Sequence, residues 1–267
     1  MKDHKGKINL AISPCPNDTF IFGGWINNLI ESDISIETVH YCDIQELNEL
    51  ATKGNFDVIK VSAAMALNVL DKYEILQSGS AMGLDCGPLL ISKRKIQINE
   101  ICKYKVGIPG KNTTANFLFK FAFPDCKNII HLNFTEIENA LLNEEIDLGV
   151  IIHENRFTYS SKNLLLVLDL GKHWYQLTKL PIPLGVILVR KDLNNDMKSA
   201  INLSIRDSIN YANLNRNSLM PYIKEHASEL EESVINQHIK LYVNEFSLDL
   251  GSNGNSALNF LFNIIKA

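Results

Sequence analysis

Two segments of this 267-residue sequence share one pattern, in which an amphipathic helix is followed by an aspartate, a short apolar strand and a polar end. They read E-L-N-E-L-A-T-K-G-N-F-D-V-I-K-V-S, ending at Ser62, and I-E-N-A-L-L-N-E-E-I-D-L-G-V-I-I-H, ending at His153. Short apolar runs of this kind are typical of buried parallel strands. Ligands bind at the carboxyl ends of such strands in open α/β sheets. The weak repeat therefore predicts two similar α/β units with polar groups at their strand ends.

Strand and helix patterns alternate through both units, which predicts parallel strands joined by right-handed crossovers. The first unit is predicted to hold strands at 8–13, 34–41 and 56–62 and helices at 20–30, 44–52 and 63–70. Asn17 or Asp18 is expected to cap the first helix, and Gly54 to end the second. The second unit is predicted to hold strands at 105–108, 129–132 and 147–153 and helices at 115–123 and 137–142.

After the second unit the chain is expected to return to the first. A strand is predicted at 184–190, and the pattern is then helical almost to the end, with a last helix at 257–265. Connections near 90–95 and 185–190 would join a large discontinuous domain, 1–92 and 190–267, to a small one, 93–189. The predicted architecture is a two-domain α/β clamp with two hinges and a central cleft, a common place for ligands.

Composition excludes several classes of protein. The chain is 46% hydrophobic and 21% charged, so it can bury a core. A net charge of −4 argues against a basic surface that would bind nucleic acid. No apolar stretch of the sequence is long enough to span a membrane. The polar start, with no signal-peptide pattern, favours a cytoplasmic protein. Five scattered cysteines are expected to be reduced thiols, without a disulfide framework or a metal site.

Polar residues at four loops or strand ends are predicted to meet in the cleft. His153, after a buried strand, is the candidate proton-transfer group, although a structural histidine at a core edge fits the pattern equally well. The candidate binding residues are expected to hold a small anionic molecule, partly on helix-start amides, or else to be only helix caps. They are Ser13, Asn17 and Asp18 in the first loop, Lys60, Val61 and Ser62 at the third strand, and Thr113 and Thr114 in P-G-K-N-T-T.

Other residues of interest are interpreted as structural. His226 and His238 lie in a glutamate-rich helical stretch and are expected to be surface or packing histidines, while His131 could be a second cleft residue. Cys15 has no evident activating base, and Glu154 would point away from His153 if the strand continued. The spacing of a phosphate-binding loop, G-x-x-x-x-G-K-[ST], is absent, which argues against nucleotide hydrolysis.

Longer motifs resemble a known enzyme family. S-P-C-P-N-D-T-F (13–20), P-G-K-N-T-T-A (109–115), D-L-G-V-I-I-H-E-N-R-F-T-Y (147–159) and L-P-I-P-L-G-V-I-L-V-R-K-D-L (180–193) are similar to 1,4-dihydroxy-6-naphthoate synthase of the futalosine route to menaquinone. H-I-K-L-Y-V-N-E-F-S-L-D-L-G (238–251) resembles the C-terminal signature of that family. The resemblance extends from residue 8 nearly to the end of the chain.

The resemblance implies a periplasmic-binding-protein-like clamp of type II that acts as a carbon–carbon lyase. It implies cleavage of cyclic dehypoxanthine futalosine to dihydroxynaphthoate and a three-carbon fragment, without a metal or an organic cofactor. His153 matches the general base of the family, and Lys60 to Ser62 and Thr113-Thr114 match its substrate contacts. V-S-A-A-M-A departs from the family near Ala64, where a bulkier aromatic residue or a histidine is expected. The alternatives are a chorismate dehydratase-type enzyme and a non-enzymatic binding protein for a small carboxylate, and the oligomeric state stays open.

Overall fold

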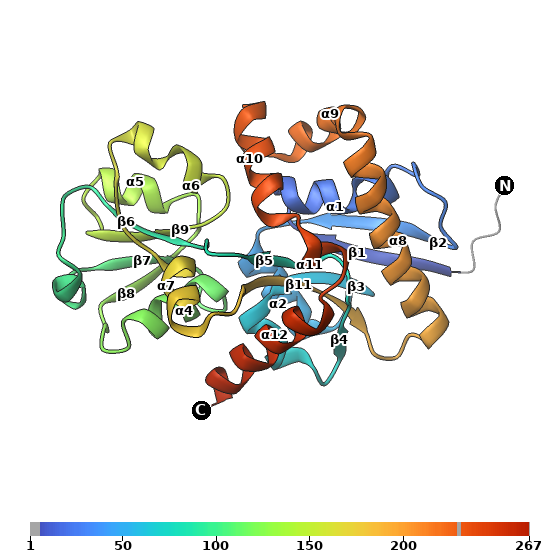
Figure 1. The fold of residues 1–267 in the computed structure, drawn as a ribbon, viewed down its shortest axis with the longest axis horizontal. Coiled ribbons are helices and arrows are strands. Elements are labelled where there is room, and N and C mark those ends of the chain that lie inside the picture. Colours follow the sequence, from blue (N-terminus) through green and yellow to red (C-terminus); the bar gives the residue numbers. More distant parts are fainter. Residues whose placement is uncertain (1–5, 229–230, 267) are drawn as a thin grey trace.

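The computed structural model describes residues 6–228 and 231–266. Within them, eleven strands form two sheets, and each sheet is the centre of one lobe (Figure 1). The chain builds most of the larger lobe, crosses to build the smaller one, and returns to the larger lobe to end in a series of helices. This is the two-unit α/β arrangement that the repeat predicts.

The sheet of the larger lobe has the strand order β2-β1-β3-β11-β4, and β5 also pairs with β11. Its strands are β1 (Gly6–Ile12), β2 (Ile34–Tyr41), β3 (Val58–Ser62), β4 (Tyr73–Ile75), β5 (Ala81–Gly83) and β11 (Ile182–Arg190). β1 is parallel to β2 and β3, and β11 is antiparallel to β3. The carboxyl ends of β1 and β3 therefore share one edge of the sheet.

The sheet of the smaller lobe has the order β8-β7-β9-β6-β10. Its strands are β6 (Leu89–Ser92), β7 (Val106–Pro109), β8 (Ile129–Leu132), β9 (Leu148–Ile151) and β10 (Leu165–Asp169). β7 is parallel to β8 and β9, and β6 is antiparallel to β9. Each sheet thus begins at one edge with three parallel strands, followed by one antiparallel strand, so the two lobes share this arrangement.

Helices cover both faces of the larger sheet, with α1 and α8 on one face and α2 and α12 on the other (Figure 1). The helices are α1 (Pro16–Ile26), α2 (Ile44–Lys53), α3 (Ala63–Ala66), α4 (Thr114–Ala122), α5 (Ile137–Leu142), α6 (Asn155–Thr158), α7 (Leu170–Thr178), α8 (Asn195–Leu214), α9 (Arg216–His226), α10 (Glu232–Tyr242), α11 (Glu245–Leu248) and α12 (Gly251–Lys266). The chain returns to the larger lobe in α8, where Ser208 Oγ accepts a hydrogen bond from the Trp25 amide of α1 at 3.1 Å. Gly54 ends α2 at a φ of 77°, as predicted.

The crossings between the lobes lie a few residues from the expected positions. β6, at 89–92, already belongs to the smaller sheet, and β11, from residue 182, already belongs to the larger one. The segments that join the sheets are therefore 84–88 and 179–181, and the expected connections near 90–95 and 185–190 are wrong. Both errors arise because an apolar strand pattern does not say which sheet a strand joins.

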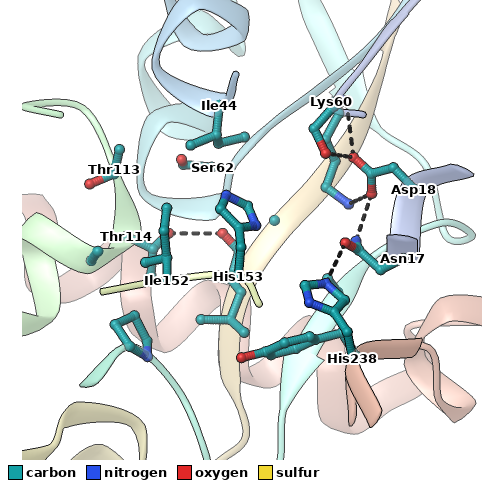
Figure 2. A pocket seen from close by; sticks show the side chains of 17 residues that line it. Asn17, Asp18, Ile44, Lys60, Ser62, Thr113, Thr114, Ile152, His153 and His238 are labelled. Carbon is teal, nitrogen blue, oxygen red and sulfur yellow. Dashed lines mark hydrogen bonds and ion pairs between the residues drawn. The ribbon is translucent and has the colours of Figure 1, made fainter. Parts of the chain in front are cut away.

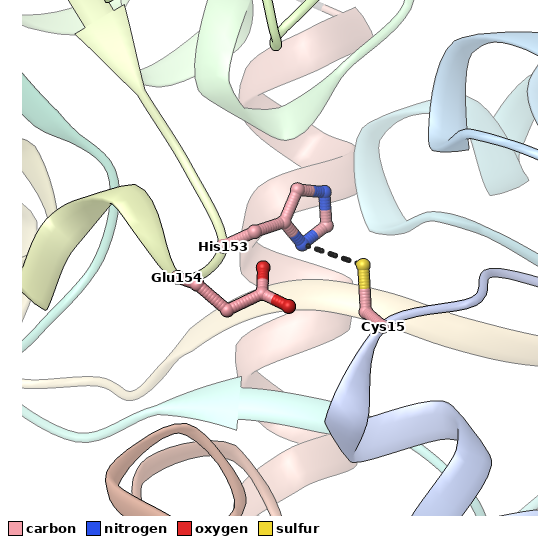
Figure 3. Close-up of side chains that lie close together, drawn as sticks. All are labelled: Cys15, His153 and Glu154. Carbon is pink, nitrogen blue, oxygen red and sulfur yellow. Dashed lines mark hydrogen bonds between the residues drawn. The ribbon is translucent and has the colours of Figure 1, made fainter. Parts of the chain in front are cut away.

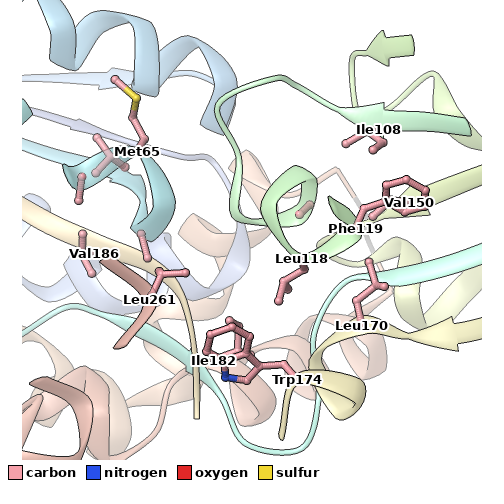
Figure 4. Close-up of a cluster of buried hydrophobic side chains, with 14 of the residues drawn as sticks. Met65, Ile108, Leu118, Phe119, Val150, Leu170, Trp174, Ile182, Val186 and Leu261 are labelled. Atoms are coloured by element: carbon pink, nitrogen blue, oxygen red, sulfur yellow. The ribbon is translucent and has the colours of Figure 1, made fainter. Parts of the chain in front are cut away.

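The largest hydrophobic cluster extends across the contact between the lobes (Figure 4). Trp174 of α7 is fully buried in it, and its ring lies 5.7 Å from that of Phe260 in α12. Leu118 of α4 and Leu261 of α12 belong to the same cluster. Buried apolar contacts therefore hold the lobes together on this side.

Two cysteines are not the free thiols that the sequence predicts. Cys102 and Cys126, which are 24 positions apart in the sequence, form a disulfide with their Cα atoms 4.4 Å apart. The spacing could not reveal this pair, because it depends on how the 3₁₀ helix Ile98–Lys103 lies against the turn after α4. Cys15, Cys42 and Cys86 are free.

No helix in the described part of the chain combines the length and the apolar character that a membrane crossing needs.

Candidate active site

A cavity of about 100 Å³ lies between the lobes, at the edge where the carboxyl ends of β1, β3, β7 and β9 meet (Figure 2). All of the site residues predicted from the sequence line it, with one exception: they are Ser13, Asn17, Asp18, Lys60, Ser62, Thr113, Thr114 and His153. Ligand pockets usually measure several hundred Å³. The small volume is consistent with lobes that have closed on each other.

Val61 is the exception. Its side chain is fully buried and belongs to the hydrophobic cluster of the core. Successive side chains of a strand point to opposite faces, so Lys60 and Ser62 reach the cavity while Val61 between them cannot. The Val61 side chain is therefore a packing residue.

Asp18 accepts most of the side-chain hydrogen bonds in the first loop, which follows β1. Its carboxylate accepts hydrogen bonds from the Ser13 amide at 3.2 Å, from Ser13 Oγ at 2.7 Å and from Asn17 Nδ2 at 2.7 Å. α1 begins at Pro16, four residues before the expected start, and its N-cap is Cys15 without a side-chain cap bond. The predicted capping role of Asn17 or Asp18 is therefore wrong. Both side chains face the cavity from inside the first turn.

Lys60 and Asp18 form a buried ion pair. Nζ of Lys60 lies 2.8 Å from Oδ1 of Asp18, and the two side chains are only 5% and 1% exposed. A buried pair of this kind is stable only when further hydrogen bonds satisfy the charges, as Ser13 and Asn17 do for Asp18. Lys60 thus fixes the first loop to β3, and its charge is already paired with Asp18.

Asn48 and Thr114 make hydrogen bonds between the lobes. Asn48 of α2 donates to Ser62 Oγ at 3.0 Å and to the Asn112 carbonyl at 2.8 Å. Thr114 Oγ1 donates to the Leu184 carbonyl at 3.0 Å and accepts from the Ala64 amide at 3.3 Å.

Thr113 is the N-cap of α4 and accepts from the Asn116 amide at 3.2 Å. Its predicted role as a helix cap is therefore confirmed. That role places the start of α4, with its outward-pointing amides, beside the cavity.

His153 follows β9 in a left-handed backbone conformation, with a φ of 56°. This turn ends the strand at Ile151 and aims the ring at the larger lobe. Phe134 of the smaller lobe packs edge-on against the ring at 5.0 Å. Burial lowers the pKa of His153 to about 4; Asp18 opposes this effect and Lys60 adds to it. The imidazole is therefore neutral at pH 7, as a general base must be.

The orienting partner of His153 comes from the other lobe. Cys15 Sγ lies 3.2 Å from Nδ1 of His153, which brings together residues from the start of α1 and the end of β9 (Figure 3). Burial, and then the nearby Glu154 carboxylate, raise the pKa of the Cys15 thiol well above its usual value, so the thiol stays protonated. The sequence predicts no activating base for Cys15; His153 does lie beside the thiol, but the raised pKa means that the thiol is not activated.

Glu154 also lies on the same side as His153, since the strand has ended and the chain turns. Its side chain is buried beside Cys15 and His153 (Figure 3). One ligand atom from each of these three residues lies within 4.8 Å of the other two, and zinc favours these ligand types. The trio could hold a cation, contrary to the expectation of no metal-ligating cluster. His40, Cys42 and Glu46 form a similar, more exposed group outside the cavity.

His238 is a site residue that the sequence analysis missed. It is 1% exposed, lines the cavity from α10, and its ring is nearly parallel to that of His153 at 6.3 Å. Tyr242 lies one helical turn later and also lines the cavity. The spacing of these two residues in H-I-K-L-Y puts them on one helix face, which was the available signal.

The other histidines of the residues that the structure describes take no part in the cavity. His226 is a packing histidine, as predicted: its Nδ1 lies 2.9 Å from the Tyr222 carbonyl. His131 lines a separate hollow between α2 and the ends of β7 and β8. Of the histidines in the described residues, only His153 and His238 line the interlobe cavity.

Comparison with known proteins places the chain in a family. A family model described as menaquinone biosynthesis matches residues 8–267. The chain belongs to this family. Two similar members are named 1,4-dihydroxy-6-naphthoate synthase: one from Thermus thermophilus, 38% identical over 96% of this chain and 92% of its own, and one from Streptomyces coelicolor, 36% identical over 95% and 91%.

Solved structures show the same fold. A protein from Archaeoglobus fulgidus is 31% identical and superposes with a TM-score of 0.92 over 98% of both chains. The ligand-binding component of an ABC-type importer from Staphylococcus aureus has a TM-score of 0.71 at 12% identity, over 97% of this chain and 92% of its own. The aliphatic sulphonate binding protein of Escherichia coli has 0.66 at 10%, over 97% and 86%. This menaquinone-biosynthesis protein therefore has the periplasmic-binding-protein fold, as the sequence resemblance implies.

Proposed function

We propose that this chain is a lyase that converts cyclic dehypoxanthine futalosine to 1,4-dihydroxy-6-naphthoate in menaquinone biosynthesis. The names of its two relatives support the reaction. The observation that carries the proposal is the neutral imidazole of His153, which lies half-buried in a cleft between two lobes and is held by a partner from the opposite lobe. A binding protein needs only groups that hold its ligand, whereas a neutral histidine in such a cleft is suited to proton transfer.

His153 acts as the general base. Cleavage of a carbon–carbon bond next to an alcohol begins with removal of a proton from the substrate. When Nδ1 carries the ring proton and directs it to Cys15 Sγ, Nε2 keeps its lone pair on the opposite edge of the ring (Figure 3). We assign this tautomer to His153, so that Nε2 is the nitrogen that takes the substrate proton. Positioned acid–base groups of this kind contribute about 10²–10⁴-fold to a rate.

The substrate carboxylate is held at the start of α4. The amides of a helix N-terminus are an anion-binding site, and Thr113 and Thr114 place this one beside the cavity. Ser62 adds a hydroxyl from β3. The Lys60 charge is paired with Asp18, so Lys60 acts mainly by shaping the first loop.

Closure of the lobes completes the site. We place the hinges in the segments 84–88 and 179–181, which join the two sheets. Thr114 and His153 of the smaller lobe contact Ala64, Leu184 and Cys15 of the larger lobe. Closure thus brings the base to its partner and removes water from the reacting groups. We expect the reaction to occur in the cytoplasm, with a small anionic molecule as the substrate.

A direct assay tests the function. Purified protein is incubated separately with cyclic dehypoxanthine futalosine and with chorismate, and the products are identified by mass spectrometry. We expect dihydroxynaphthoate from the first and no change in the second. Dehydration of chorismate would identify the sister enzyme of the pathway, and binding of either compound without turnover would identify a binding protein.

A further inference from the structure

His238 carries a buried nitrogen with no hydrogen-bond partner among the described residues. The ring projects from α10 into the cavity, and its Nε2 lies 2.9 Å from Oδ1 of Asn17 (Figure 2). Its Nδ1 is buried and makes no hydrogen bond to the described part of the chain. Buried polar atoms are almost always paired, so this one calls for a reason.

The hydrogen-bond network fixes which nitrogen carries the proton. Asn17 Nδ2 lies 2.7 Å from Oδ1 of Asp18, and the same oxygen forms the ion pair with Nζ of Lys60 at 2.8 Å. A carboxylate oxygen paired with a lysine only accepts, so the Asn17 atom beside Asp18 must be the amide nitrogen. The amide oxygen of Asn17 therefore faces His238 and requires a donor, which makes the ring an Nε2–H tautomer.

It follows that Nδ1 of His238 is a lone-pair acceptor. Burial, together with the nearby His153 and Lys60, lowers the pKa of His238 well below its usual value, so the ring stays neutral and Nδ1 stays unprotonated. Three aromatic rings surround the His238 ring. The centroids of Tyr242 and Phe157 lie 4.9 Å and 6.5 Å away in edge-on contacts, and the His153 ring lies nearly parallel at 6.3 Å. His153 and Phe157 belong to the smaller lobe, so opening the lobes uncovers this side of the ring.

We propose that Nδ1 of His238 accepts a hydrogen bond from a neutral hydroxyl group of the substrate, which makes His238 a specificity-determining residue of the cleft. The inference rests on the proposed function, because an alcohol is the donor that cyclic dehypoxanthine futalosine supplies. A ligand that lacks this hydroxyl leaves the nitrogen buried and unpaired. Such a ligand is disfavoured by about ten- to a hundredfold in affinity.

Two substitutions of similar polarity separate this role from a purely structural one. In His238→Asn the short amide reaches the position of Nδ1, and in His238→Gln the longer amide reaches the position of Nε2. Binding of the substrate is measured in a His153→Ala background, so that it is not consumed. We expect His238→Asn to bind within a few-fold of the background, and His238→Gln to bind about ten- to a hundredfold more weakly. The opposite order would show that His238 serves only to hold Asn17, and would overturn the proposal.

A measurement on the unsubstituted ring covers the case in which both substitutions weaken binding equally. ¹⁵N NMR of the His153→Ala variant should show His238 protonated at Nε2, and its Nδ1 resonance should shift when substrate is added. An unmoved Nδ1 resonance at saturating substrate overturns the proposal. His226→Gln, outside the cavity, is the matched control and should bind substrate normally. If the unsubstituted enzyme does not cleave the substrate, the proposed function fails; if it cleaves and Nδ1 does not respond, only the role of His238 fails.

Discussion

Cys15 Sγ and His153 Nδ1 are 3.2 Å apart, although the two residues are 138 positions apart in the sequence. Cys15 precedes α1 in the larger lobe, and His153 follows β9 in the smaller one. The contact exists only while the lobes are closed, so the orientation of the base depends on closure. This coupling would keep His153 from taking its working orientation before a ligand has brought the lobes together.

Replacement of Cys15 should therefore affect turnover more than binding. Cys15→Ala removes the partner of Nδ1, and a lost hydrogen bond of about 0.5–1.5 kcal/mol corresponds to a kcat about two- to tenfold lower. Cys15→Ser keeps a polar atom and should lose less. Steady-state kinetics give kcat and KM for both, with Cys42→Ala, outside the cavity, as the control. A normal kcat in Cys15→Ala would show that another group orients the ring.

His153→Ala should retain ligand binding and lose turnover. The imidazole is the group that we assign to proton removal, so kcat is expected to fall about 10²–10⁴-fold. Calorimetric titration with substrate checks that the site still binds. His131→Ala, outside the cavity, should behave like the unsubstituted enzyme. Unchanged turnover in His153→Ala would exclude the general-base role.

The pH dependence of kcat should report the low pKa of His153. Burial lowers that pKa from about 6.5 to about 4, so the base stays deprotonated through mildly acidic solution. We expect kcat to remain level as the pH falls past 6.5 and to drop only toward pH 4. An acidic limb centred near 6.5 would indicate a hydrated ring.

The lowered pKa of His153 also makes the free energy of unfolding depend on pH. Between pH 6.5 and about 4 the unfolded chain binds a proton at His153 that the folded protein does not bind. The free energy of unfolding contributed by this group is therefore fully present above pH 6.5 and is lost as the pH falls toward 4. Thermal unfolding at each pH measures this loss and shows at which pH values the kcat data refer to folded enzyme.

The buried pair of Lys60 and Asp18 should be sensitive to removal of one partner. Lys60→Met leaves the Asp18 carboxylate buried without its cation, which costs about 3–5 kcal/mol of unfolding free energy. Lys60→Met combined with Asp18→Asn should recover part of that loss, because no buried charge remains. Urea denaturation measures all three variants. Lys103→Met, which breaks an exposed pair with Glu100, should leave the midpoint unchanged.

Thr114→Val should mainly weaken substrate binding. The hydroxyl of Thr114 joins α4 to the Leu184 carbonyl and the Ala64 amide of the other lobe, so its loss disfavours the closed state. Each lost hydrogen bond is worth about 0.5–1.5 kcal/mol, so KM should rise several-fold at a similar kcat. Thr114→Ser keeps the hydroxyl and is the control. A normal KM in Thr114→Val would mean that Thr114 serves only the helix start.

The sequence was sufficient to predict most of the elements and eight of the seventeen residues that line the cavity. The strand before Ser62 and the strand before His153 were predicted from short apolar runs, and Gly54 from its place after a helical segment. Strand alternation also explains why Val61, predicted as a binding residue, belongs to the core instead. These features depend on a few neighbouring residues, so a linear sequence can reveal them.

The partners within the site were decided by tertiary structure. Cys15 meets His153, Lys60 meets Asp18, and His238 meets Asn17 across 221 positions of the chain. The disulfide between Cys102 and Cys126 and the sheet to which β6 belongs are of the same kind. Each of these contacts depends on which parts of the chain the fold brings together. The spacing of residues along the sequence does not reveal that arrangement. The sequence determined two α/β units with polar strand ends, and only the folded chain decided which polar group faces which, because hydrogen bonds and ion pairs form between neighbours in space.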